Sequence, residues 1–299
     1  MGKISFGRRA FNIVNYSFLT VLGIVFLFPY LHILSKAIND SMDTAKGGIS
    51  FFPRVPTLQN IIIILSDQSF GHALMISVSR VVLGTLLALV VQFSAAYVLS
   101  KRDLIGKKMI VVYFIIPMFF SGGIIPLYML FSKLHLLNNF LLYVLPGTFS
   151  FYNMIVMRTY IYAIPESLLE SARIDGARES FILVRIILPL SMPIIATIGL
   201  WSAVGHWNDW ITTLYYITNK KLYTIQYLLM MVIRESEKVQ AMIQAALEQG
   251  KDVDTIKVIT TPDALRCAQI IVTTLPIVMI YPFLQKYFIK GVMIGAVKE

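Results

Sequence analysis

The chain has 299 residues, of which 57% are hydrophobic and only 14% are charged, and its mean hydropathy is +0.73. Water-soluble globular proteins carry about 25% charged residues, so this composition excludes an ordinary soluble fold and indicates a membrane protein. One cysteine, Cys267, excludes an intrachain disulfide and a cysteine metal cluster, and its apolar surroundings predict a small packing residue.

The first predicted element is a membrane helix over about 11–36. The basic residues Lys3, Arg8 and Arg9 precede its apolar run, as in a signal peptide. The run is too long for a signal sequence, and the stretch Leu34-Ser35-Lys36-Ala37 is a poor cleavage site. The sequence therefore predicts an uncleaved first span.

Five further segments contain the roughly 20 apolar residues that a helix needs to cross a bilayer. They cover about 70–99, 109–131, 140–163, 190–217 and 264–289. Several contain proline or glycine, which membrane helices tolerate when neighbouring groups satisfy the freed backbone. The predicted fold is all-α: a polytopic bundle of six transmembrane helices in a single domain over 1–299, embedded in the lipid bilayer.

The basic residues predict how the bundle is oriented, because loops on the cytoplasmic side are enriched in Lys and Arg. Six spans place both termini on one side, together with the segments 101–108 and 158–185. That side holds 14 basic and 6 acidic residues, whereas the other side holds 11 basic and 10 acidic residues. We therefore expect a multi-pass protein of the plasma membrane with both termini in the cytoplasm. The net charge of +10 then needs no nucleic-acid partner.

Two long loops are expected on the outer side, over about 37–69 and 218–263. The second contains a helical pattern in which apolar residues share one face, and Gly250 is a candidate end of that helix. Thr261-Pro262 is a candidate start for the last span. The amphipathic helix is expected to lie on the bilayer, pack on the bundle or meet a partner protein.

The segment 164–189, between the fourth and fifth spans, has the pattern of a helical hairpin on the basic side. Pro165 and Glu166 favour a helix start, Gly176 suits a left-handed helix end, and Pro189 is expected to end the second helix. Charged and apolar residues separate onto two sides; the apolar side contains Leu168, Leu169, Ala172, Phe181 and Ile182, and the charged side contains Arg173, Asp175, Arg178 and Glu179.

This hairpin resembles the EAA loop of ABC importer permeases. The motif positions fall on Glu170, Ala172, Gly176, Ile186, Leu188 and Pro189 with every spacing kept, and Asp175 precedes the glycine. Ser171 replaces the first alanine of the motif, a small-for-small change. The resemblance implies that the loop docks in a cleft of an ATP-hydrolysing subunit and transmits its closure to the bundle as a rigid body.

The resemblance extends over most of the chain, which is similar to the smaller, maltose-type permeases of carbohydrate importers. The stretch FSGGIIPLYMLFSKLHLLNN is similar to the branch that takes complex oligosaccharides or polysaccharide fragments. The family implies four partners: a second permease forming a heterodimer, an ATP-binding-cassette ATPase dimer, an extracellular solute-binding protein and an oligosaccharide. It also implies that the loop 218–263 reaches toward the binding protein and that the tail 290–299 approaches the ATPase dimer.

Ionisable residues at membrane depth are costly and usually functional. Arg80 and Asp209 are such residues, and His206 is close to Asp209 in the sequence. Asp209 and its neighbours Trp207, Asn208 and Trp210 offer the aromatic faces and hydrogen-bonding groups of a sugar path, which Tyr152 and Asn153 are expected to share. Two alternatives stay open. In the alternative to a sugar path, Asp209 pairs with a cation and the tryptophans lie at the outer membrane interface. Arg80 either attracts an anionic sugar or pairs with a residue inside the bundle.

The sequence contains no motif for chemistry beyond transport. A phosphate-binding loop, a zinc-protease helix and a nucleophile elbow are all absent, and the four histidines lack metal-ligand spacing. We therefore expect no catalytic residue, no metal and no cofactor in this chain, with ATP and Mg bound by the partner ATPase. The alternatives are a self-contained secondary sugar transporter, which should show internal repeats, and a membrane-embedded enzyme, which should show a catalytic constellation.

Overall fold

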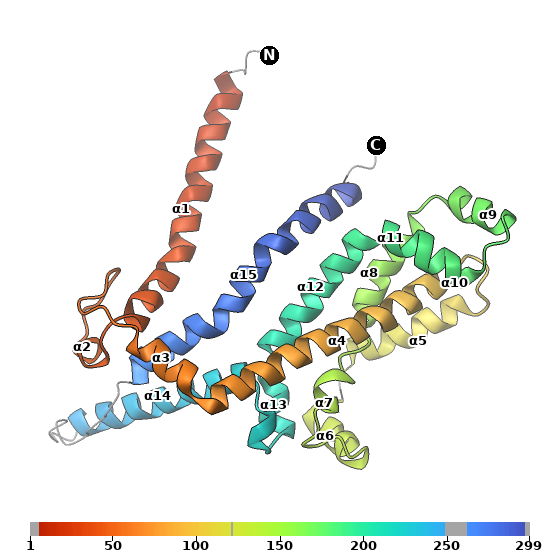
Figure 1. Cartoon of the computed structure of the whole chain (residues 1–299). Helices are drawn as coiled ribbons and strands as arrows, with labels where there is room; N and C mark the ends of the chain where they lie inside the picture. Colours follow the sequence, from red (N-terminus) through yellow and green to blue (C-terminus); the bar gives the residue numbers. More distant parts are fainter. Residues whose placement is uncertain (1–5, 121, 249–261, 297–299) are drawn as a thin grey trace. The chain divides into compact units, whose positions relative to one another are not determined.

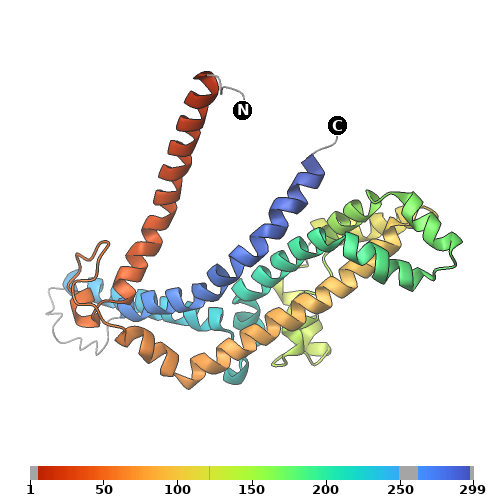
Figure 2. The same cartoon turned by 45° about the horizontal axis from the view of Figure 1, so that its top comes forward.

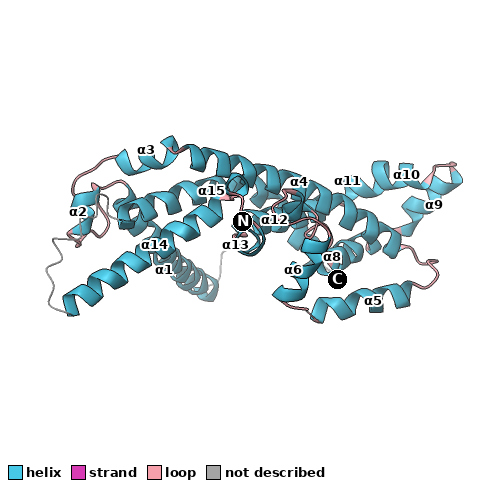
Figure 3. Cartoon of the chain, turned by 90° about the horizontal axis from the view of Figure 1, so that it is seen from below, coloured by secondary structure: helices cyan, strands magenta, loops and turns pink. Residues whose placement is uncertain are grey.

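The computed structural model describes residues 6–120, 122–248 and 262–296, and in this part of the chain the regular elements are helices, with no strand (Figure 3). The chain divides into two compact units. The first comprises Met1–Phe70 and Leu229–Leu275, and the second comprises Gly71–Leu228 and Pro276–Glu299. Each unit is described separately.

The first unit begins with α1 (Phe6–Ala37), a long helix followed by the short helices α2 (Ser41–Ala45) and α3 (Gln59–Ser66) (Figure 1). It also contains most of α14 (Ile225–Glu248) and the first part of α15 (Pro262–Ala296). The start of α15 at Pro262 matches the predicted start of the last span, because proline suits the first turn of a helix. Gly250, the predicted end of the preceding helix, lies outside the described residues.

The second unit contains most of α4 (Gln68–Ser100), followed by α5 (Lys107–Phe119), α6 (Ile124–Lys133), α7 (Leu141–Val144) and α8 (Phe151–Tyr162). A hairpin follows, made of α9 (Glu166–Ile174), α10 (Glu179–Phe181), a π-helical turn (Ile182–Ile187) and α11 (Leu188–Leu190). The chain then enters α12 (Met192–Asn208), α13 (Ile211–Tyr216) and a 3-10 turn (Lys220–Leu222). Figure 2 shows α9 and α10 at the end of α4 that carries Ser100.

The predicted spans agree with the observed helices to different degrees. α1 and α4 match the first two closely, and these are the two described helices that are long and apolar enough to cross a membrane unaided. The predicted third span is two helices, α5 and α6, whose axes differ by 114°, and the fifth is preceded by a 78° bend before α12. Counting each bent pair as one span gives up to four. The expected count of six is therefore not reached by the described residues.

The breaks have local causes. Gly123, just before α6, has a φ of +84°, and glycine adopts this left-handed region without penalty. In the predicted fourth span, α7 ends before Pro146-Gly147, and α8 restarts with Ser150, whose side chain accepts from the Asn153 N–H. Proline and glycine thus divide apolar stretches that hydropathy alone presents as continuous.

The core of the second unit lies between α4, α8 and α12 and reaches the hairpin. It contains buried aromatic, aliphatic and methionine side chains from all of these elements, including Phe93, Tyr97, Met154, Met157, Ile182, Ile187 and Ile198. Because Ile182 and Ile187 come from the π-helical turn, the hairpin is packed on the helices by its own apolar residues and is not a free loop.

Candidate functional site: a helical hairpin and a buried polar cluster

The hairpin turns at Gly176, which has a φ of +76°. The N–H of Ala177 donates to the Ala172 carbonyl at 2.9 Å, and the N–H of Gly176 donates to the Arg173 carbonyl at 3.0 Å. These bonds close α9 in the manner of a glycine C-cap. A side chain on residue 176 would meet open space but not a favourable backbone conformation. The prediction of a left-handed Gly176 is confirmed.

Pro189 does not end the second helix as predicted. It lies inside α11, and the chain bends two residues later, at Ser191 between α11 and α12. The six residues before Leu188 are π-helical. Proline has no N–H to donate and its ring crowds the carbonyl four residues earlier, so a wider turn relieves that contact and keeps the helix going.

The two sides of the hairpin also differ from the sequence pattern. Leu169, Ala172 and Ile182 pack toward the core as expected, but Leu168 and Phe181 are exposed. Ile174, at the end of α9, is 86% exposed. The outer surface is therefore mixed apolar and charged, and it forms a shallow depression of about 590 Å³ that includes Ala172, Gly176, Phe181 and Ile186.

Exposed ion pairs join the hairpin to the loop after α4. Lys101 lies 3.0 Å from Glu179, and Arg102 lies 3.2 Å from Glu166. Within the hairpin, Arg173 lies 3.4 Å from Glu179. The Tyr97 hydroxyl also donates to Glu179 at 2.5 Å. The two basic segments that the sequence assigns to one side of the membrane, 101–108 and 158–185, are thus in contact in the structure.

Arg80 and Asp209, the two ionisable residues predicted at membrane depth, are also in contact. The Arg80 guanidinium is buried, pairs with the Asp209 carboxylate and donates a second bond to the Asp209 carbonyl at 2.9 Å. Asp209 also accepts from the Thr212 N–H at 3.0 Å. Of the alternatives left open by the sequence, internal pairing of both residues is the one that the structure contains.

The ring of Tyr143 in α7 contacts the arginine of this pair. The sequence did not indicate this contact. The Arg80 guanidinium lies 4.6 Å from the centroid of the Tyr143 ring. The Tyr143 hydroxyl is 2.9 Å from the Thr213 hydroxyl and donates to the Leu222 carbonyl at 2.7 Å. Tyr143 is one of the largest fully buried side chains, and it ties α4, α7 and α13 together at one point.

A pocket of about 460 Å³ borders this cluster, lined by Arg80, Tyr143, Ser202, His206 and Asp209 among others. Gly84 of α4 makes room for the His206 ring, because a Cβ there would lie 2.5 Å from His206 Nε2. Gly147 faces the same ring, and a Cβ at residue 147 would lie 3.1 Å from His206 Cε1. A close approach that only glycine permits is invisible in a single sequence.

The remaining predicted path residues do not form one group. Trp207 is buried, whereas Asn208 is exposed and accepts from Gln226 at 3.5 Å. Tyr152 stacks on Trp201, with ring centroids 6.4 Å apart. Asn153 and Trp210 are half-buried. The sequence did not single out Trp201, although its spacing of seven residues from Asn208 places both on one face of α12.

Comparison with known proteins decides the class. Residues 80–294 match the family described as "Binding-protein-dependent transport system inner membrane component". The chain belongs to this family. Its relatives include the protein LplC of Bacillus subtilis, 35% identical over 97% of this chain and 95% of that protein. The polygalacturonan/rhamnogalacturonan transport system permease protein YtcP of the same organism is 32% identical, over 97% and 99%.

A solved structure supports the same assignment. A chain of a bacterial ABC transporter involved in the import of the acidic polysaccharide alginate has a TM-score of 0.82 and 26% identity to this permease, covering 96% of this chain and 100% of that one. Membership makes this chain a multi-pass permease subunit of an ABC importer. The predicted all-α permease fold is confirmed, and the alternative of a self-contained secondary transporter is not favoured.

Proposed function

We propose that this permease carries oligosaccharides released from polysaccharides, and that the hairpin 164–189 couples their passage to ATP hydrolysis on a partner. The observation that carries the coupling proposal is the hairpin itself. It keeps the motif spacing from Glu170 to Pro189, it turns at a left-handed Gly176, and it is packed on the bundle core through Ile182 and Ile187.

The docking surface is the outer side of the hairpin. Glu170 and Asp175 are exposed, and Ala172, Gly176 and Ile186 line the depression beside Phe181. An ATP-binding-cassette ATPase dimer, which binds ATP and Mg, is the partner that this surface would contact. Leu188 and Pro189 belong to α11, which ends two residues before the first residue of α12. A movement of the hairpin would therefore be passed directly to α12.

The proposed topology places the hairpin and both termini in the cytoplasm. The contacts between the basic segments 101–102 and 166–179 support it, since loops rich in Lys and Arg stay on that side. A second permease completes the pore as a heterodimer, and an extracellular binding protein delivers the sugar; the family description names binding-protein dependence. The loop 218–263 would face that protein, and the tail 290–299 the ATPase. Residues 249–261 and 297–299 of these segments lie outside the described residues.

The sugar path is proposed to follow the exposed face of α12 beside α8. This face carries Trp201, Gly205 and Asn208, next to Tyr152 of α8. The exposed face of α5, in contrast, carries Met109, Val112, Ile116 and Phe119 and suits lipid. A stacked aromatic pair together with an exposed amide is the kind of surface on which a sugar ring packs and hydrogen-bonds.

Arg80 and Asp209 have a different place in this proposal. Their charges are paired with each other, so they shape the pocket at the end of the path and do not present a net charge to an anionic sugar. YtcP is described as a transporter of polygalacturonan and rhamnogalacturonan, and the structural relative imports alginate, which favours fragments of such polysaccharides as the substrate class.

Gly176→Val in the reconstituted importer tests the coupling proposal. A β-branched residue in the left-handed region costs roughly 1–2 kcal/mol, so the turn of the hairpin should change its conformation. We therefore expect substrate-stimulated ATP hydrolysis and uptake to fall while the subunit stays in the membrane. Gly106→Val is the matched control, because Gly106 has the same φ of +76°, lies next to open space and belongs to the loop after α4 but not to the motif. Equal losses in both variants, or none in Gly176→Val, would refute the coupling role.

Trp201→Ala tests the path. We expect uptake to need a higher oligosaccharide concentration for half-maximal rate, because the stacking surface with Tyr152 is lost. Tyr113→Ala is the control, since Tyr113 is an exposed aromatic on α5. Uptake measured with acidic and with neutral oligosaccharides distinguishes the substrate class.

A further inference from the structure

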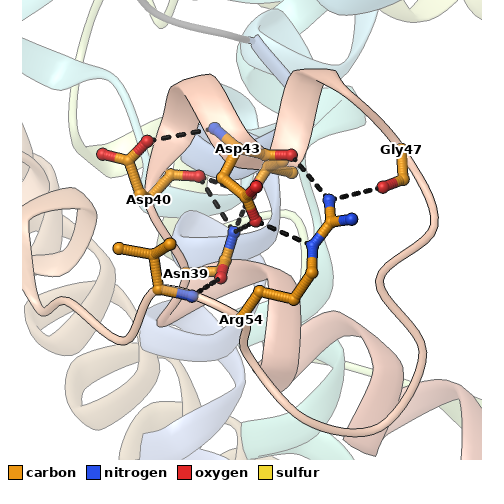
Figure 4. A network of polar contacts seen from close by, with 7 residues as sticks. Asn39, Asp40, Asp43, Gly47 and Arg54 are labelled. Carbon is orange, nitrogen blue, oxygen red and sulfur yellow. Dashed lines mark hydrogen bonds and ion pairs between the residues drawn. The ribbon is translucent and has the colours of Figure 1, made fainter.

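The loop between α1 and α3, which includes the short helix α2, is held in one conformation by a polar network (Figure 4). Asn39 is its centre and is fully buried. Its side-chain amide donates to the Asp43 carboxylate at 3.1 Å and to the Thr44 hydroxyl at 3.0 Å, and its carbonyl oxygen accepts from the Val55 N–H at 2.8 Å. A buried amide with its hydrogen bonds satisfied fixes the backbone around it.

Arg54 closes the other side of the same network. Its guanidinium donates to the Asp43 carboxylate at 3.0 Å, to the Asp43 carbonyl at 3.1 Å and to the Gly47 carbonyl at 2.6 Å. The charges of Asp43 and Arg54 therefore face each other inside the loop (Figure 4). Gly47 and Gly48 have φ values of +74° and +75°, which lets the chain turn tightly before the tip.

The tip of the loop is apolar and projects two phenylalanines. Phe52 is 84% exposed, and Phe51 is half exposed. The Phe51 ring packs edge-on against Phe28 of α1, with centroids 4.9 Å apart. His32, one turn further along α1, donates from Nδ1 to the Ser50 carbonyl at 3.0 Å. The tip is thus attached to the side of a helix that crosses the membrane.

The contact with Phe28 sets the depth of the tip. The apolar part of α1 runs over about 11–36, so its midpoint lies near residue 23 or 24. At 1.5 Å per residue, Phe28 lies about 7 Å from the midpoint and His32 about 13 Å. The hydrocarbon core extends about 15 Å from the bilayer centre. Phe51 is therefore at the depth of the outer acyl chains, and the bond at Ser50 is near their boundary.

From this placement we propose that Phe51 and Phe52 are a membrane-surface anchor, inserted into the leaflet that faces this loop at the boundary between acyl chains and headgroups. Aromatic side chains are enriched at this boundary. A lipid occupant fits better than a soluble protein, because the tip offers no unpaired charge and lies at a depth that a soluble partner does not reach. The anchor would hold α1 at a fixed height, since the polar network transmits the position of the tip to the end of the helix.

Spin labels at two strongly exposed positions of the loop test the anchor. Phe52→Cys and Met42→Cys are labelled in a Cys267→Ala background, in the importer reconstituted into phosphatidylethanolamine–phosphatidylglycerol vesicles. Met42 is 71% exposed and belongs to α2, which begins beyond the end of α1, so we expect it in water. We expect the label at 52 to collide mainly with oxygen, which concentrates in lipid, and the label at 42 to collide mainly with a water-soluble nickel chelate.

Two outcomes would overturn the proposal. A label at 52 that is as accessible to the nickel chelate as the label at 42 means that the tip is in water. A label at 52 that is immobile and shielded from both reagents means that a protein covers it. The added change Arg54→Ala supplies a further readout: the label at 52 should become more mobile and more variable in depth if the network holds the tip, and an unchanged spectrum would contradict that part.

Discussion

The Arg80–Asp209 contact and the ion pairs of the hairpin are all contacts between a basic side chain and a carboxylate. They differ in solvent exposure. Arg80 is buried, and its partner is held by further hydrogen bonds from Thr212. Glu179 and Arg102 of the hairpin region are about half or more exposed. Exposed ion pairs contribute roughly 0–1 kcal/mol, whereas breaking one partner of a buried pair costs roughly 3–5 kcal/mol.

This difference matches what each region has to do in the proposed mechanism. The buried pair joins α4 to the segment before α13. Because separating the two residues would leave a buried charge without a partner, we expect this contact to stay intact while the permease works. The hairpin pairs can exchange one partner for water at little free-energy change, so the outer surface of the hairpin can adapt to a docking protein while its inner residues stay packed. The rigidity of the Arg80–Asp209 contact and the adaptability of the hairpin surface both follow from their solvent exposure.

The largest effect is expected from Arg80→Met, which leaves the Asp209 carboxylate without its cation in a mostly buried site. The free energy of unfolding should fall by roughly 3–5 kcal/mol, measured as thermal unfolding of the purified permease in detergent. Arg102→Met, in the exposed pair with Glu166, should change it by less than about 1 kcal/mol.

A double variant separates the pair from other effects of losing Arg80. In Arg80→Met with Asp209→Leu no charge is left unpaired, and much of the lost stability should return, because apolar replacements of a buried pair are often neutral. If the double variant is as unstable as Arg80→Met, the arginine contributes mainly through Tyr143, over whose ring it lies.

The second largest effect is expected at Gly84. Gly84→Ala puts a Cβ within 2.5 Å of His206 Nε2, so the ring or a helix must move, and overpacking of this kind typically costs about 1–3 kcal/mol. Gly71→Ala in the same helix has nothing within 4 Å and should be neutral or stabilising by about 0.5–1 kcal/mol. Thermal unfolding of the two variants gives the comparison, and equal unfolding temperatures would show that the contact with His206 yields freely.

The Arg80–Asp209 pair and the Gly84–His206 contact show which features of the molecule can be predicted from the sequence and which cannot. Hydropathy located α1 and α4, and motif spacing located the hairpin and its left-handed Gly176, because each signal is local along the chain. The pairing of Arg80 with Asp209 joins residues 129 positions apart, so the sequence indicates both residues but not that they contact each other. Tyr143, Gly84 and Trp201 are defined by what they touch, and no local pattern distinguishes them from ordinary core or lipid-facing residues.

The same reasoning explains the errors in the predicted spans. An apolar window reports that a segment avoids water, not that it is straight. Gly123, Pro146 and Ser191 each sit where the backbone changes direction, and the apolar residues on both sides still satisfy the hydropathy test. The direction of a bend depends on tertiary packing, which a window average does not contain.

A smaller effect is expected from Glu179→Gln, which removes the pairs with Lys101 and Arg173 while keeping the shape of the side chain. The unfolding free energy should fall by less than about 1 kcal/mol, and raising the salt from about 0.05 M to 1 M should remove most of the difference from wild type, because screening weakens exposed pairs. A loss of stability as large as that of Arg80→Met, or one that salt does not change, would show that the buried pair and the exposed hairpin pairs do not differ in their contribution to stability.

The smallest effect concerns acid and the loop of the first unit. The hydrogen bond from Asn39, together with that from Arg54 and the charge of Arg54, holds the pKa of Asp43 below its ordinary value of 3.8. A carboxyl with a lowered folded pKa stabilises the fold above the unfolded pKa, and this contribution is lost as the pH falls through the folded value. The mobility of a spin label at residue 52 should therefore stay constant from pH 8 to about pH 4 and rise only below it. Asp43→Asn should remove this acid-dependent rise, and a rise that begins near neutral pH would show that another group controls the loop.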